Sequence, residues 1–295
     1  MSMETMHIAF CLDNNYVEQI LAVIRSIAHS NANQNINIYL VFNDLNEQNQ
    51  ARFKAVETSN LTIHCRPTNV VVDGVGPQNH VSKATFVKFE LINALPELGK
   101  VLYLDGDIVV NGDLAPLWQT DLKDRYLAGV ENPFSTRQAA LDMDSDAVYF
   151  NAGILLMNLT KMRKENFYQK AHDYIEQCGD KLMFHDQDVF NHLVNGQFVQ
   201  LSEVFNFQTF FIRKIHRFSA EKRRYYRNLM KNATIVHYSS GIKPWDKFDP
   251  HPLVGLFRQY YEGRLKHAKD DSYLQQLFRY LYVKAYYFYF LNLAR

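Results

Sequence analysis

Two aspartates separated by one glycine are the clearest candidates for chemistry in this sequence. Asp105 and Asp107 follow the apolar run 101–104, and side chains two residues apart in an extended segment point to the same side. Two carboxylates held so close repel each other unless a cation lies between them. Carboxylate oxygens suit Mg²⁺ or Mn²⁺, with a substrate phosphate completing the coordination shell. Gly106 lets a ligand approach the backbone. The alternative is a solvated turn.

A histidine and a lysine in the second half of the chain can complete such a site. His237 lies in the apolar run 235–238, and Lys243 follows six residues later, beyond Gly241. An imidazole ligand beside two carboxylates favours Mn²⁺ over Mg²⁺, and a lysine ammonium can neutralise a phosphate as a point charge. A histidine at the end of an apolar strand is more often a core residue. This segment therefore indicates a metal and phosphate site only in combination with Asp105 and Asp107.

Two further segments carry polar residues that a sugar could use. Asn151 lies in the apolar run 150–159, and a buried amide needs partners that a polyhydroxyl ligand can supply. Asp186, Gln187 and Asp188 open a predicted helix; acidic residues in a first turn complement the helix dipole, which explains either aspartate but not Gln187. The sequence contains no P-loop, no dinucleotide-binding glycine fingerprint and no nucleophile elbow.

The order of strand and helix signals predicts where these residues lie. We predict strands at 7–12, 36–42, 61–64, 101–104, 150–159 and 233–238, helices at 20–27, 48–56, 82–95, 160–177 and 186–194, and a loop at 67–79. This alternation predicts an α/β fold with a mixed, mostly parallel sheet. Ligands of such sheets bind beyond the carboxyl ends of the strands, and both Asp13 and the Asp105/Asp107 pair follow predicted strands.

The composition excludes several classes of protein. Apolar residues make up 47% of the 295 residues, so the chain is not disordered. The 32 basic and 31 acidic residues nearly cancel, which argues against a nucleic-acid partner. Three cysteines without a short pairing pattern fit a reducing compartment and no structural zinc. We expect no signal peptide and no transmembrane helix, and hence a cytoplasmic location.

The chain resembles the retaining glycosyltransferases of family 8, the group of bacterial lipooligosaccharide galactosyl- and glucosyltransferases, over roughly residues 6–250. The segments that carry the resemblance are residues 10–16 (FCLDNNY), 82–91 (SKATFVKFEL), 100–110 (KVLYLDGDIVV), 113–118 (DLAPLW), 149–159 (YFNAGILLMNL), 186–188 (DQD) and 237–245 (HYSSGIKPW). Each motif is modest alone, but their shared order and spacing are specific.

The resemblance implies a Rossmann-like fold of the GT-A type, a UDP-hexose donor and Mn²⁺, with Mg²⁺ as the alternative. The residues that match the family's site one by one are Asp13 and Asn15 for uridine, Lys88, Asp105 and Gly106 for the donor, Lys243 for the diphosphate, Asn151, Asp186 and Gln187 for the transferred sugar, and Asp105, Asp107 and His237 for the metal. Glu131 falls near an acidic sugar contact of the family.

Two departures from the family pattern bear on the donor site. The family usually has Arg where this chain has Lys88, which keeps the charge and loses the bidentate fork. Ser240 takes a position where the family has glycine, with Gly241 following.

The residue placed below the anomeric carbon by resemblance is Gln187, a poor nucleophile. We therefore expect attack on the same face, with an oxygen of UDP taking the acceptor proton, and Asp186 as nucleophile only if it reaches the carbon.

The expected protein is a hexosyltransferase that moves galactose or glucose from a UDP-sugar to a lipopolysaccharide or lipooligosaccharide acceptor. The alternatives are a glycosidase-like hydrolase, a catalytically inactive module that binds sugar nucleotides or glycans, and a transferase acting on protein side chains. We expect a catalytic domain at residues 1–250 and a C-terminal aromatic and basic helical appendage at 251–295.

The C-terminal appendage has a composition suited to a membrane surface. Residues 273–290 contain nine Tyr and Phe residues, and aromatic side chains favour the headgroup region of a bilayer. The basic residues Arg223, Arg224, Arg227 and Lys231 could add attraction to anionic lipid. We expect a peripheral attachment to the inner face of the cell membrane, near an oligosaccharide or lipid-linked glycan acceptor. The alternative is a helix buried against its own domain or an oligomer partner.

Overall fold

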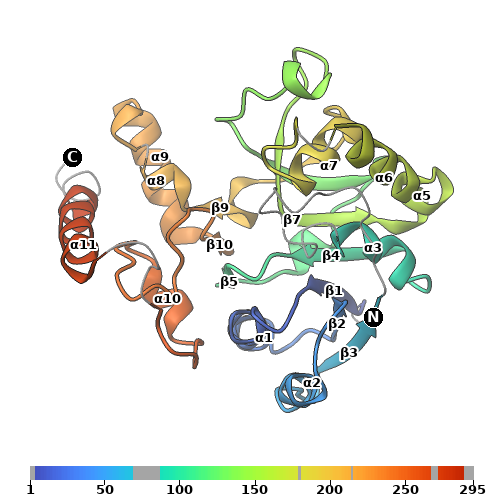
Figure 1. Cartoon of the computed structure of the whole chain (residues 1–295), viewed down its shortest axis with the longest axis horizontal. Coiled ribbons are helices and arrows are strands. Elements are labelled where there is room, and N and C mark those ends of the chain that lie inside the picture. Colours follow the sequence, from blue (N-terminus) through green and yellow to red (C-terminus); the bar gives the residue numbers. More distant parts are fainter. Residues whose placement is uncertain (1–3, 69–86, 179–180, 214, 267–271, 289–295) are drawn as a thin grey trace. The chain divides into compact units, whose positions relative to one another are not determined.

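The computed structural model describes residues 4–68, 87–178, 181–213, 215–266 and 272–288 (Figure 1). The chain divides by its internal contacts into two units, which are treated separately here. The first comprises residues 1–15, 33–105 and 114–202, and the second comprises residues 16–32, 106–113 and 203–295. Each unit has a β-sheet of its own. The division into domains at residue 250 remains a prediction.

The first unit contains a seven-stranded sheet in the order β3-β2-β1-β4-β7-β6-β8. Its strands are β1 (Met6–Cys11), β2 (Ile36–Phe42), β3 (Leu61–Pro67), β4 (Lys100–Leu104), β6 (Leu127–Glu131), β7 (Phe150–Asn158) and β8 (Val199–Gln200). Only β7 runs antiparallel to its neighbours, β4 and β6, whereas the other pairs are parallel. The predicted α/β fold with a mixed, mostly parallel sheet is confirmed.

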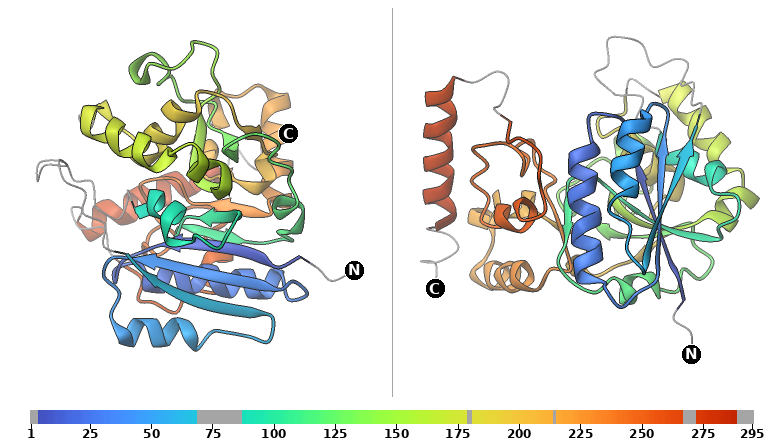
Figure 2. Two further views of the ribbon diagram at one scale, coloured as in Figure 1. Left: turned by 90° about the vertical axis from the view of Figure 1, so that its right-hand side faces the viewer. Right: turned by 90° about the horizontal axis from the view of Figure 1, so that it is seen from below.

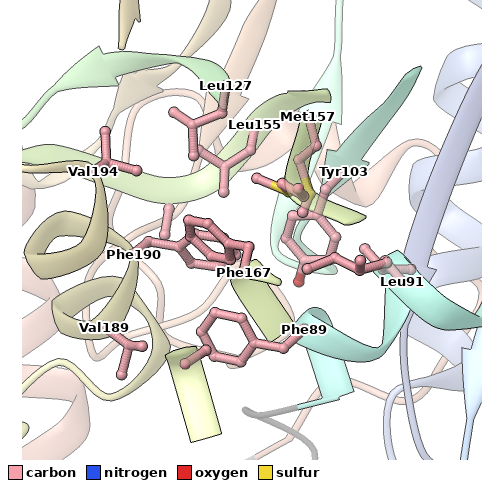
Figure 3. Packing of buried hydrophobic residues seen from close by; sticks show 14 of the residues in the cluster. Phe89, Leu91, Tyr103, Leu127, Leu155, Met157, Phe167, Val189, Phe190 and Val194 are labelled. Atoms are coloured by element: carbon pink, nitrogen blue, oxygen red, sulfur yellow. The ribbon is translucent and has the colours of Figure 1, made fainter. Parts of the chain in front are cut away.

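Helices cover this sheet and close the core of the first unit. They are α2 (Glu47–Lys54), α3 (Val87–Ala94), α4 (Ala115–Trp118), α5 (Leu159–Lys164), α6 (Phe167–Cys178) and α7 (Asp186–Val194). Figure 3 shows Phe89 of α3, Phe167 of α6 and Phe190 of α7 gathered below Leu155 of β7 in that view. The rings of Phe89 and Phe190 stack at 4.6 Å. Burying each such side chain stabilises the fold by about 1.5–3 kcal/mol.

Strands β1 and β4 place two acidic turns at one edge of the sheet. They are parallel neighbours, with Ile8 opposite Leu102, so their carboxyl ends lie on the same side. Strand β4 is buried almost throughout, as its uninterrupted apolar run predicts. Pairing with β7 continues one residue beyond β4, because the amide of Asp105 donates to the carbonyl of Gly153 at 2.8 Å. Asp105 is therefore held by the sheet itself.

The second unit contains a three-stranded sheet in the order β5-β10-β9. Its elements are α1 (Val17–Ser30), β5 (Ile108–Val110), β9 (Phe207–Gln208), α8 (Phe210–Arg213), α9 (Ala220–Asn232), β10 (Ile235–His237), α10 (Val254–Arg258) and α11 (Tyr273–Phe288). Strands β5 and β10 are antiparallel, and His237 lies opposite Ile108. The residue before β5, Asp107, is thereby brought beside His237 at the end of β10.

The helices predicted at 160–177, at 82–95 and at the C-terminus agree with the structure to different extents. The helix predicted at 160–177 is two helices, α5 and α6, because Asn166 has a φ of 52° between them. Of the helix predicted at 82–95, residues 82–86 lie outside the described residues, as do residues 69–79 of the predicted loop and residues 289 and 290 of the aromatic segment. Helix α11 confirms a C-terminal helical segment (Figure 2). No helix among the described residues is long and apolar enough to cross a bilayer.

Candidate active site

His237 and Asp107 form the centre of a candidate metal site in the second unit. His237 Nε2 lies 3.3 Å from Asp107 Oδ1, and His237 is buried, with 3% of its surface exposed. Its other ring nitrogen, Nδ1, lies 3.0 Å from Asn206 Oδ1. An amide oxygen only accepts, so Nδ1 donates to Asn206 and Nε2 is the ring nitrogen that faces Asp107. A second hydrogen bond of this kind is typical of metal-binding histidines.

Asp105 extends this pair to a set of three ligand groups. Asp105 precedes Asp107 by two residues in the chain, and Asp105, Asp107 and His237 each offer one ligand atom. Two carboxylates and one imidazole are a donor set suited to a divalent cation such as Mn²⁺. Gly106, between the two aspartates, is itself closely packed, because a Cβ atom there would lie 3.2 Å from Ile20.

Lys243 supplies a positive charge beside Asp107. Its ammonium lies 2.6 Å from Asp107 Oδ2 and donates to the carbonyl of Tyr238 at 3.0 Å. Burial acts to raise the pKa of Asp107, but its interactions with Lys243 first and with His237 outweigh burial and hold this pKa well below its usual range. Asp107 is therefore ionised at neutral pH and able to bind a cation. The change to Ser240 in the preceding turn leaves Lys243 in place.

In the first unit, Lys88 lies between two carboxylates. Its ammonium forms an ion pair with Asp186, lies 3.7 Å from Asp105 and donates to the carbonyl of Ala152 at 2.8 Å. Asp105 also accepts a hydrogen bond of 2.6 Å from the hydroxyl of Tyr103. Lys88 is 5% exposed, so this charge is fixed by its partners and not by water.

The pKa values of this cluster reflect one cation shared by two anions. Burial acts to lower the pKa of Lys88, but Asp186 and Asp105 outweigh it and the pKa is raised. The pKa of Asp186 is also raised, by burial first and by repulsion from Asp105, with Lys88 opposing both. The donor-binding residue predicted at position 88 thus serves as the counter-ion of two other predicted site residues.

Gln187 and Asn151 meet across the first turn of α7 and strand β7. Asn151 Nδ2 donates to Gln187 Oε1 at 3.0 Å, and the amide of Ala152 donates to the same oxygen at 3.0 Å. The structure thus gathers Lys88, Asp105, Asn151, Asp186 and Gln187 in the first unit. These are the residues predicted for the transferred sugar, together with part of the donor site.

Asp188 has a role in the site that the sequence prediction missed. It is fully buried and accepts hydrogen bonds from Tyr149 OH at 2.6 Å, Arg137 at 3.0 Å and the amide of Phe184 at 2.9 Å. Neither it nor Asp186 occupies the N-cap position of α7, which is His185. The DQD motif was the available signal for Asp188, whereas nothing near Arg137 or Tyr149 in the sequence indicates the pairing.

The turn into α7 is built on an unusual backbone. His185 has φ 50° and ψ −121°, a conformation that favours glycine. The amide of Gln187 donates to the carbonyl of Phe184 at 3.0 Å, so residues 184–187 form a tight turn. This turn places Asp186 and Gln187 side by side at the start of the helix.

Asp13 and Asn15 form a separate local turn after β1. Asp13 Oδ1 accepts from the amide of Asn15 at 2.8 Å, and the intervening Asn14 binds the β2–α2 loop through Asn46 and Asn49. In the part of the chain that the structure describes, Asp13 forms no hydrogen bond or ion pair with Lys88, Asp105 or Asp186. Glu131, at the end of β6, accepts from Gln200 at 3.2 Å. The uridine and sugar roles of these residues remain predictions.

Comparison with known proteins assigns the chain to a family. The model of glycosyl transferase family 8 matches residues 7–249. The chain belongs to glycosyltransferase family 8. It is 26% identical to General stress protein A of Bacillus subtilis over 87% of this chain and 93% of that protein. It is 27% identical to the lipopolysaccharide 1,2-glucosyltransferase of Escherichia coli K12 over 91% of this chain and 80% of that enzyme.

A solved galactosyltransferase structure has the same fold. The galactosyltransferase LgtC, in complex with donor and acceptor sugar analogues, matches with a TM-score of 0.75 and 26% identity, over 90% of this chain and 98% of that one. The fold is therefore of the GT-A type, and the chain is a glycosyltransferase. Glycosyltransferases of this fold typically use a divalent metal, and the carboxylate–imidazole set around Asp107 fits one.

Proposed function

We propose that this glycosyltransferase is a metal-dependent retaining hexosyltransferase that moves galactose or glucose from a UDP-sugar to a cell-surface glycan. The observation that carries the proposal is the contact of His237 Nε2 with Asp107, backed by the hydrogen bond of His237 to Asn206. An imidazole nitrogen and a carboxylate oxygen at 3.3 Å are placed where a cation could bind both. The second carboxylate, Asp105, is two residues away.

The proposed metal ligands are Asp105, Asp107 and His237, with Mn²⁺ preferred and Mg²⁺ as the alternative. A divalent ion bound there would neutralise the diphosphate of the donor. Lys243 would contribute a further charge, because its ammonium already faces the same carboxylate. As UDP leaves, charge develops on its oxygens, and a fixed ammonium stabilises that charge without reorganising.

The residues proposed for the sugar support attack on the face that UDP leaves. Gln187 is an amide and therefore a poor nucleophile, and Asp186 forms an ion pair with Lys88. A double displacement needs a carboxylate that can bond the anomeric carbon. An oxygen of the departing UDP would instead take the proton of the acceptor hydroxyl. A trapped glycosyl adduct on Asp186 would contradict this mechanism, and an inverted anomeric configuration of the product would contradict retention.

The acceptor is proposed from the relatives. One of them is described as a lipopolysaccharide glucosyltransferase, and the solved structure as a galactosyltransferase with an acceptor sugar analogue. A cell-surface oligosaccharide or lipid-linked glycan is therefore the acceptor class we propose. Asp13 and Asn15 are proposed for uridine, at the carboxyl end of β1 where nucleotides bind in α/β sheets.

The decisive experiment is a panel of UDP-sugars assayed for release of UDP with Mn²⁺, with and without EDTA. We expect release from UDP-galactose or UDP-glucose, abolished by EDTA, and faster with an oligosaccharide acceptor. Free sugar as the main product without a metal requirement would indicate a hydrolase. Binding of UDP-sugar without release of UDP would indicate an inactive binding module. Labelled sugar recovered on protein would indicate protein acceptors.

We also propose that α11 attaches the enzyme to the inner face of the cell membrane, in the cytoplasm. Five large apolar side chains of this helix are more than half exposed: Leu274, Phe278, Leu281, Tyr282 and Phe288. Their spacing of three and four residues gathers most of them on one side of a helix. Helix α9 adds the exposed cations Arg224 and Lys231, which would attract anionic lipid.

A further inference from the structure

The hydrogen atoms of the network around Gln187 can be assigned from chemistry alone. We infer that Tyr149 is a positioning residue that locks the Gln187 amide, so that Gln187 presents an N–H group, and not its oxygen, to the bound hexose. The identity of the hexose rests on the proposed function. The orientation of the amide rests on contacts within the first unit.

Contacts with backbone amides identify which side-chain atom of Gln187 is the oxygen. The amide of Ala152 lies 3.0 Å from one side-chain atom of Gln187, and because a backbone N–H only donates, that atom must be the oxygen. The amide of Gly153 likewise donates to Asn151 Oδ1 at 3.0 Å. Asn151 therefore turns its NH₂ group toward Gln187 Oε1, at 3.0 Å. Both lone pairs of the Gln187 oxygen are occupied.

The buried carboxylate of Asp188 fixes the direction of the Tyr149 hydroxyl and thereby identifies the nitrogen of Gln187. Asp188 accepts from Arg137 and from the amide of Phe184 through Oδ2, and from Tyr149 OH through Oδ1 at 2.6 Å. The carboxyl group of Asp188 is the acceptor in all three contacts, so the hydroxyl hydrogen of Tyr149 points to Asp188. The lone pairs of that hydroxyl then face Gln187 Nε2, at 3.0 Å. Burial raises the pKa of Tyr149 far above its usual value, which keeps this hydrogen in place.

This arrangement leaves Gln187 one hydrogen-bonding group for a ligand. Its oxygen has two donors and one N–H is bound to Tyr149, so the second N–H is the group left over in the described part of the chain. Turning the amide over would place an NH₂ group against the amide of Ala152. Gln187 would therefore donate to a hydroxyl or ring oxygen of the hexose, and its oxygen would not approach the anomeric carbon.

The first test is the variant Tyr149→Phe in the full chain, with the UDP-sugar that wild type uses. Without the phenol oxygen the nitrogen end of the Gln187 amide loses its partner and the group is held at its oxygen end alone, so we expect kcat for UDP release to fall between about 10-fold and 100-fold. We expect KM for the UDP-sugar to change by less than about 3-fold, because the uridine and diphosphate contacts remain. The matched control is Tyr174→Phe, which removes a buried hydroxyl that has no hydrogen-bond partner among the residues that the structure describes. An unchanged kcat in Tyr149→Phe would overturn the inference.

The second test needs neither substrate nor turnover. In ¹⁵N-labelled protein, the two side-chain N–H signals of Gln187 are assigned by their loss in Gln187→Met. We expect both signals to shift in Tyr149→Phe and to stay in place in Tyr174→Phe. Signals that do not move in Tyr149→Phe would refute the locked amide. If wild type releases no UDP from any donor, the proposed function fails, and these signals still decide the orientation.

Discussion

Asp107 concentrates the charge interactions of the candidate metal site in one side chain. Each of its oxygens faces a different nitrogen, His237 Nε2 at 3.3 Å and Lys243 Nζ at 2.6 Å. The lowered pKa of Asp107 shows that these partners outweigh the effect of burial. A neutral amide of the same shape would therefore remove the charge on which both partners depend.

The variant Asp107→Asn tests the metal site at this residue. We expect metal-dependent release of UDP to fall by at least about 100-fold, because a carboxylate ligand and its charge are lost together. Titration with Mn²⁺ should show weakened metal binding, independent of turnover. The matched control is Asp124→Asn, whose side chain is 97% exposed and forms an ion pair with Lys161 at 3.2 Å. Full activity in Asp107→Asn would refute the proposed site.

The shared cation Lys88 gives a prediction about stability and pH. In Lys88→Met, Asp186 loses its counter-ion in a buried site, which costs about 3–5 kcal/mol when the carboxylate is ionised. The pKa of Asp186, already raised in wild type, would rise further. A carboxylate with a raised folded-state pKa loses stability as pH increases from its unfolded pKa through its folded one. The raised pKa of Lys88 keeps the wild-type pair intact throughout the neutral range.

Thermal unfolding at pH 5 and pH 8 measures this effect. We expect the difference in Tm between wild type and Lys88→Met to be larger at pH 8 than at pH 5. Lys54→Met serves as control, because it breaks the half-exposed pair with Glu57, and should lower Tm little at either pH. A difference in Tm that is equal at both pH values, or larger at pH 5, would contradict the assigned role of Lys88.

At the scale of elements, the tight turn at 184–187 positions Asp186 and Gln187, the residues of α7 proposed to bind the sugar. His185 holds a backbone conformation that lacks steric penalty only for glycine. We expect His185→Gly to be more stable than His185→Ala by roughly 1–2 kcal/mol, the reverse of the order seen inside helices. Both variants lack the imidazole, so their difference in urea unfolding isolates the backbone. An alanine variant as stable as the glycine variant would show that the turn is not strained.

Whether a feature leaves a trace in the local residue pattern explains which elements could be predicted from the sequence. The strand at β4 was predictable because a strand buried on both faces has an uninterrupted apolar run. The break at Asn166 was not, since hydrophobic spacing continues through it and only the backbone angle reveals the turn. Asp105, Asp107, His237 and Lys243 were predictable from residue type and spacing. The partners of Asp188 were not, because Arg137 lies 51 residues away in sequence.

At the scale of the whole molecule, the exposed apolar residues of α11 need an explanation, because exposed apolar patches usually mark interaction sites. The opposite side of this helix carries Gln276, which is buried, and Tyr280, whose ring lies 6.0 Å from that of Phe248. The helix thus has one side that packs within the second unit and another that is exposed. The two occupants weighed from the sequence, lipid and an oligomer partner, predict different behaviour of the same variant.

The double variant Phe278→Ser/Leu281→Ser distinguishes these occupants. With vesicles containing phosphatidylglycerol, we expect the full wild-type chain to co-sediment and the variant to bind at least about 10-fold more weakly, because it lacks two exposed apolar side chains that would enter the bilayer. Raising the salt concentration should also weaken wild-type binding, as screening reduces the attraction of Arg224 and Lys231 to anionic lipid. The control is Met183→Ser, which removes an exposed apolar side chain far from α11 in sequence. If the double variant instead converts a dimer to a monomer without changing vesicle binding, α11 serves self-association, and the membrane proposal is wrong.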